Sequence, residues 1–199
     1  MGAAVGATLA ISTGTSGTGA PPSALGSLSV FVEAAPPRAE PEIAHLADGP
    51  WADRGDLSKL RVLGEALGSF DSRLVAFPSL SGGTICYSLL AARNTDPGMS
   101  YCYPPLSSNL PAPLAGLHFD VSTLYSALDG KPHVQVFGLA FDDVEGVRVR
   151  IGDAWQDAAL VKNGFYLDLP DHQLNDVEVV EATLSDGSTQ TYPVPRTPV

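Results

Sequence analysis

Three short turn signals divide the last part of this chain into pieces the length of β-strands. Gly152-Asp153, Asn163-Gly164 and Asp186-Gly187 each lie between runs in which apolar and polar residues alternate. Glycine beside Asn or Asp readily adopts the positive φ that tight hairpin turns require. In the run "GVRVRIGD" the aliphatic residues point to one side and the two arginines to the other, as in a half-buried strand. The carboxyl-terminal part is therefore predicted to consist of antiparallel hairpins.

The same reasoning extends upstream through "SRLVAFPSL", "GTICYSLLAA", "GMSYCYPP", "LHFDVSTLYSA" and "HVQVFGLAF". These runs are short, β-prone and separated by Gly- or Pro-containing turns, without strand–helix alternation. We expect a mostly β fold, an antiparallel sandwich or small barrel. One short helix is expected between Asp56 and Gly68, where four leucines recur at helical spacing.

Composition divides the chain into three segments. Residues 1–20 form a small-residue tail or the remnant of an export or anchor segment that begins upstream. Residues 21–55 carry six prolines and form a Pro-rich linker, since proline at this density disfavours long helices. Residues 56–195 form the β-rich domain.

The charge balance excludes one class of partner. The formal net charge is −11, and the most basic feature is the pair Arg148 and Arg150 in one strand. A nucleic-acid-binding surface needs clustered Lys and Arg to displace counterions from phosphates. We therefore expect no nucleic-acid partner.

Cys86 and Cys102 are the only cysteines and fall on two neighbouring predicted strands. Adjacent strands lie about 5 Å apart, which suits a disulfide. A redox pair more often has two residues between its cysteines, and zinc needs further ligands, whereas no histidine lies near either cysteine. We expect a disulfide and hence an oxidising compartment, with two buried thiols as the alternative.

Other side chains are weaker candidates. Tyr87, Tyr101 and Tyr103 surround the cysteines and are a candidate exposed patch for a partner. Asp142, Asp143 and Glu145 form an acidic loop that could hold calcium, although a polar turn is the simpler interpretation and no metal or other cofactor is expected.

The histidines and tryptophans admit two interpretations each. His118 and His133 would form a cross-strand pair if the hairpin between them is symmetric, as imidazoles packed together or as two metal ligands. Trp155 and Trp51 are sugar-stacking candidates if exposed. A core or rim position is favoured for Trp155, and Trp51 is expected to pin the linker onto the domain.

The order of "FPSLSGGTICYSL", "MSYC" and "VFGLAFDDVEGVRVRIGD" resembles small actinobacterial-type envelope proteins of uncharacterised activity. Those proteins combine a membrane anchor, a Pro-rich spacer and a β-rich outer module. The resemblance implies an extracytoplasmic location, secreted or membrane-anchored, with an envelope component or a protein as partner. We expect a non-enzymatic structural or binding module, tethered through an N-terminal segment. The alternatives are a hydrolase with an unrecognised active site and a cytosolic accessory protein with free thiols.

Overall fold

The computed structural model of the chain describes residues 28–32, 40–49, 51–80, 84–91, 99–103, 116–125 and 130–194. The helical elements are η2 (Ser29–Phe31), α1 (Glu40–Ala47), η3 (Leu57–Lys59) and η4 (Leu174–Asp176). The strands are β1 (Arg61–Leu67), β2 (Ser72–Pro78), β3 (Ile85–Ala91), β4 (Met99–Tyr103), β5 (Leu117–Tyr125), β6 (Pro132–Ala140), β7 (Val144–Ile151), β8 (Ala154–Asp157), β9 (Ala159–Val161), β10 (Gly164–Pro170), β11 (Val177–Leu184) and β12 (Thr189–Pro193). The prediction of a mostly β fold is confirmed.

The carboxyl-terminal strands form a two-sheet sandwich. One sheet has the order β5-β6-β10-β9 and the other β12-β11-β7-β8, with antiparallel pairing throughout. Taken along the chain as A, B, C, C′, D, E, F and G, the strands give sheets ABED and GFCC′. This is the strand order of the immunoglobulin sandwich. Topology alone does not assign a function.

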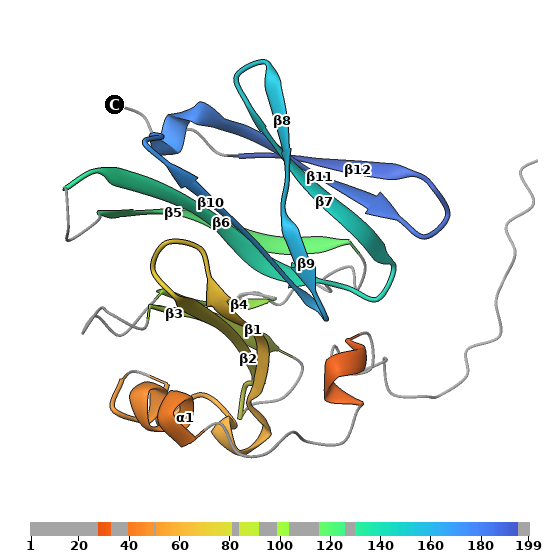
Figure 1. Cartoon of the computed structure of the whole chain (residues 1–199). Coiled ribbons are helices and arrows are strands. Elements are labelled where there is room, and N and C mark those ends of the chain that lie inside the picture. The colour runs from red at the N-terminus through yellow and green to blue at the C-terminus, as the bar shows by residue number, and fades with distance from the viewer. Residues whose placement is uncertain are drawn as a thin grey trace, which may run out of the picture.

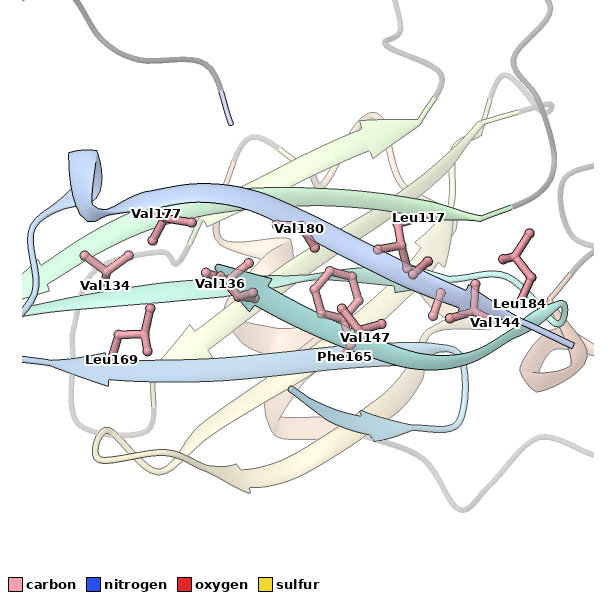
Figure 2. Packing of buried hydrophobic residues seen from close by; sticks show 13 residues of the cluster. Leu117, Val134, Val136, Val144, Val147, Phe165, Leu169, Val177, Val180 and Leu184 are labelled. Atoms are coloured by element: carbon pink, nitrogen blue, oxygen red, sulfur yellow. The ribbon is translucent and has the colours of Figure 1, made fainter. Parts of the chain in front are cut away.

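The core of this sandwich is aliphatic. Val134, Val136 and Phe165 from one sheet pack against Val147 and Val180 from the other (Figure 2). Each is almost fully buried, and burying such a side chain stabilises the fold by about 1.5–3 kcal/mol. The alternation in "GVRVRIGD" is explained here, because Val147 and Val149 face this core while Arg148 and Arg150, which alternate with them, lie on the outer face.

A third sheet packs on the outside of the sandwich. Strands β1 to β4 form an antiparallel meander, which covers the second face of the β5-β6-β10-β9 sheet (Figure 1). Leu74 and Tyr87 from the meander meet Phe137, Leu139 and Tyr166 from the sandwich in one buried cluster. Strand β6 is consequently buried on both faces from His133 to Ala140.

Helix α1 and the turn before it extend the folded region towards the N-terminus. Leu46 of α1 packs with Phe77 and Cys86 on the outer side of the meander, and Leu28 and Val30 are buried between the meander and the sandwich. The linker expected over residues 21–55 therefore includes residues whose side chains pack against the β-rich domain. Proline at position 41 is compatible with α1 because it occupies the first turn, where its missing N–H costs nothing.

The prediction of a helix between Asp56 and Gly68 is wrong. The chain there forms the short turn η3 and then strand β1. Leu60 belongs to the cluster beneath α1 and Leu63 to the cluster facing the sandwich. The leucines thus serve two opposite faces of a sheet, and their spacing only coincides with a helical period.

Candidate functional site

The disulfide predicted between Cys86 and Cys102 is confirmed. The S–S distance is 2.06 Å, and the two residues are directly opposite in the register of β3 and β4. Cys86 is fully buried in the cluster beneath α1, where it packs near Phe77 and Leu90. The disulfide ties the edge strand of the meander to its interior.

The tyrosines around the disulfide do not form the expected exposed patch. Tyr87 is fully buried, and Tyr101 is half-buried against the same cluster, with its ring centroid 5.8 Å from that of Tyr87. The alternation is as expected, because Tyr101 and Cys102 point to opposite faces, but the tyrosine face is the inner one. The side chain of Tyr103 lies outside the described part of the structure.

A cluster of polar side chains lies where β3 and β4 meet the edge strand β5. Tyr87 Oη and His118 Nδ1 are 3.1 Å apart, and Ser122 Oγ donates to Asp120 Oδ2 at 3.0 Å. Burial lowers the pKa of His118 to about 4, so the imidazole is neutral at pH 7. The pKa of Tyr101 is raised to about 12, mainly by burial and to a smaller extent by a hydrogen bond with Asp120. Burial also raises the pKa of Tyr87 well above its ordinary value.

His118, Asp120 and Ser122 do not have the geometry of a catalytic triad. In a triad the histidine lies between the hydroxyl and the carboxylate and takes the hydroxyl proton. Here the Ser122 hydroxyl donates directly to Asp120, and His118 Nδ1 faces Tyr87. The group has the character of a packed polar contact between two sheets.

The expectation that His118 and His133 face each other is wrong. The register pairs His118 with Leu139 and His133 with Leu124, because the hairpin turns near Gly130 and not midway between the histidines. His133 Nδ1 instead lies 3.2 Å from Asp168 Oδ1. Among the described residues no group of three or more His, Cys, Asp and Glu side chains is arranged to hold a metal ion.

Two carboxylates of the acidic loop accept hydrogen bonds from neighbouring segments of the chain. Asp142 Oδ1 accepts hydrogen bonds from the Ser29 amide at 2.9 Å and from Asn163 Nδ2 at 2.8 Å. Asp143 Oδ1 accepts from the Gly116 amide at 3.1 Å. Glu145 is exposed. These contacts match the interpretation as a polar turn that connects β6 to β7.

A partly exposed group of one aromatic and four charged side chains lies on the outer face of the β12-β11-β7-β8 sheet, and we call it the Trp155 face. It consists of Trp155, Arg148, Arg150, Glu178 and Glu181. The Trp155 side chain is 39% exposed, and the guanidinium carbons of Arg148 and Arg150 lie 4.5 and 5.9 Å from its ring centroid. Glu181 pairs with Arg148 at 2.7 Å and Glu178 with Arg150 at 2.8 Å.

The register produces the Trp155 face. Arg150 lies opposite Trp155 across β7 and β8, and Arg148 lies opposite Glu181 across β7 and β11. All four residues of β8 are exposed. Of the core and rim positions expected for Trp155, the core position is not observed, because its side chain lies on the outer face of the edge strand β8. Trp51, by contrast, packs edge-on against Phe77 with ring centroids 5.7 Å apart, as expected for a residue that pins the preceding segment.

Comparison with models of known protein families, with curated proteins and with solved structures gives no match to this chain. In the described part of the chain, no helix has both the length and the apolar character needed to cross a membrane.

Proposed function

We propose that this chain is a non-enzymatic extracytoplasmic module of a cell envelope, which binds a neutral polysaccharide through the Trp155 face. The Cys86–Cys102 disulfide is the observation that supports the location. Disulfides persist in oxidising compartments and are rare in reducing ones. The resemblance of the sequence to anchored envelope proteins points the same way.

The chemistry of the Trp155 face supports the class of ligand. An exposed indole offers a flat apolar surface with a polar N–H, which suits the apolar face of a sugar ring. Both arginines are already paired with glutamates, so the face has no spare positive charge for an anionic polymer. The chain as a whole carries a formal net charge of −11, which also disfavours anionic ligands.

The location is tested by adding protease to spheroplasts of the native host. The proposal expects the protein to be digested while a cytosolic marker protein stays intact. Digestion of the protein only after lysis would contradict an extracytoplasmic location.

Binding is tested by affinity electrophoresis in gels that contain a neutral polysaccharide, such as a glucan, a mannan or an arabinogalactan. The wild-type protein should be retarded by at least one of these polymers, and Trp155→Ala should migrate as in an empty gel. Tyr125→Ala is the matched control, because Tyr125 is also an exposed aromatic residue but lies on β5. Equal retardation of wild type and Trp155→Ala, or no retardation of wild type, would contradict binding by this face.

A further inference from the structure

Residues 28–32, the sequence "LSVFV", are bound to the domain as a short peptide would be. Leu28 and Val30 are 0% and 3% exposed and insert between the meander and the sandwich. Phe31 packs against the same cluster, and the three residues 29–31 form the turn η2. Figure 1 draws this turn in red-orange beside the end of β9.

Three side chains of the domain hold the backbone of this segment. Asp142 Oδ1 accepts from the Ser29 amide at 2.9 Å, and Asn163 Oδ1 accepts from the Val30 amide at 2.9 Å. Arg61 Nε donates to the Val30 carbonyl oxygen at 3.2 Å. The Ser29 hydroxyl also donates to Asn163 Oδ1 at 3.2 Å, so the site contacts one polar side chain of the segment as well as its backbone.

The domain itself fixes these side chains in place. Asn163 is 3% exposed, and its Nδ2 donates to the Ala140 carbonyl oxygen at 3.0 Å and to Asp142 Oδ1 at 2.8 Å. Arg61 is also buried, and its Nη1 donates to the carbonyl oxygens of Lys59 and Leu60. The groups that meet the segment are therefore oriented by contacts that do not involve it, which lowers the cost of binding.

We propose that residues 28–32 are a detachable peptide ligand, and that the site formed around Arg61, Asp142 and Asn163 accepts the same segment from a second copy of this chain. The site already binds this sequence within one molecule, so it has the shape and hydrogen-bonding groups to bind it between molecules. Exchange of an identical segment between copies needs no new contact. Two modules would then be linked through their N-terminal segments.

The first test uses the full chain with its own segment disabled by Leu28→Asp and Val30→Asp, and a fluorescent synthetic peptide of residues 26–34. Anisotropy should show saturable binding to this variant. Binding to the wild-type chain should be at least about tenfold weaker, because a tethered segment competes at millimolar effective concentration. Adding Asn163→Ala should abolish binding, and a peptide carrying the two aspartates should not bind. Absence of binding to a folded disabled variant, or equal binding to every variant, would overturn the proposal.

A second test measures how readily the segment detaches in the wild-type protein. Hydrogen exchange of the wild-type protein should show the Ser29 and Val30 amides exchanging at least a hundredfold faster than the amides of β6, since a detachable segment opens without global unfolding. If these amides exchange only with global unfolding, or if the disabled variant cannot fold, the segment is an integral part of the core and the proposal is wrong.

A third test asks whether the segment links two copies of the chain. Two differently tagged wild-type populations should co-purify after mixing at high concentration, and two tagged populations of the disabled variant should not. Failure of the wild-type populations to co-purify would contradict exchange between copies.

Discussion

Cys86 and Cys102 face each other directly across β3 and β4, with their Cα atoms 3.9 Å apart and their sulfur atoms bonded. One of the pair is fully buried beneath α1, and the other lies on β4 at the edge of the meander. The disulfide therefore connects β4, an edge strand of this sheet, to the interior strand β3. Its removal should affect the meander before the sandwich.

Replacing both cysteines by alanine should lower the free energy of unfolding by about 3 kcal/mol, because the disulfide closes a loop of moderate length. Urea denaturation of the double variant and of the wild type measures the difference. Dithiothreitol should destabilise the wild type by a similar amount and leave the double variant unchanged. A double variant as stable as oxidised wild type would contradict this role.

Gly138→Ala should be severely destabilising. A Cβ atom at this position would lie 2.1 Å from the His118 carbonyl oxygen and 2.6 Å from Phe119 Cα, so the backbones of β5 and β6 would have to separate. Overpacking of this kind costs about 3 kcal/mol or more. Gly146→Ala is the control, since its Cβ would meet nothing nearer than 3.8 Å, and its stability should change little. Equal effects of the two substitutions in urea denaturation would contradict the close approach of β5 and β6.

Stability should fall between pH 6.5 and pH 4 through His118. Its pKa in the folded protein is about 4, below the ordinary 6.5, so the unfolded chain binds a proton in this range that the folded protein does not. The stability present above pH 6.5 is lost as the pH falls towards 4, by up to about 3 kcal/mol.

The difference between wild type and His118→Phe isolates the contribution of this imidazole to the pH dependence of stability. Urea denaturation across the range should show a steeper loss of stability for wild type. Identical profiles for wild type and His118→Phe would show that burial does not shift this pKa.

Trp155→Ala should change the free energy of unfolding by no more than about 1 kcal/mol, the usual size of an exposed cation–π contact. Trp51→Ala should cost about 3 kcal/mol, because that ring packs against Phe77 in a buried cluster. Urea denaturation of both variants gives the comparison. A loss at Trp155 as large as that at Trp51 would mean that Trp155 is a structural residue and not one available to a ligand.

The β12-β11-β7-β8 sheet was predictable because one of its faces packs on the core and the other carries polar side chains. In β7, Val147 and Val149 alternate with Arg148 and Arg150, and the hairpin of β11 and β12 turns around Asp186-Gly187 as predicted. The disulfide followed from the placement of its cysteines on paired strands. Each of these signals is local in the sequence, so one chain suffices to detect it.

The wrong predictions concern strands whose two faces are both covered by other parts of the protein. Strand β1 sends Leu63 towards the sandwich and Val62 towards α1, which removes the period-two alternation and leaves a helix-like spacing. Tyr87 was expected at the surface because a third sheet packed against the sandwich could not be foreseen from short strands alone. The register of β5 and β6 pairs His118 with Leu139 and His133 with Leu124, and the alternation of residues in the two strands does not determine this register.

The residues of the two proposed binding sites were harder to predict than the strands. The Trp155 face depends on which strands are neighbours, since Glu178 and Glu181 come from β11 and the arginines from β7. The site for residues 28–32 combines Arg61, Asp142 and Asn163 from three separate parts of the chain. The Asn163-Gly164 pair predicts a turn, but the contacts of the Asn163 side chain with residues 29 and 30 are defined only by the tertiary structure.

The extracytoplasmic assignment is tested most directly by differential alkylation of protein taken from its native host without reduction, followed by mass spectrometry. Free thiols are blocked with one reagent, and thiols released by reduction are labelled with a second. If the protein is extracytoplasmic, Cys86 and Cys102 should carry only the second label, and a crosslinked peptide should be found before reduction. First-label modification of both cysteines in denatured but unreduced protein would contradict it, because the chain would then reside in a reducing compartment.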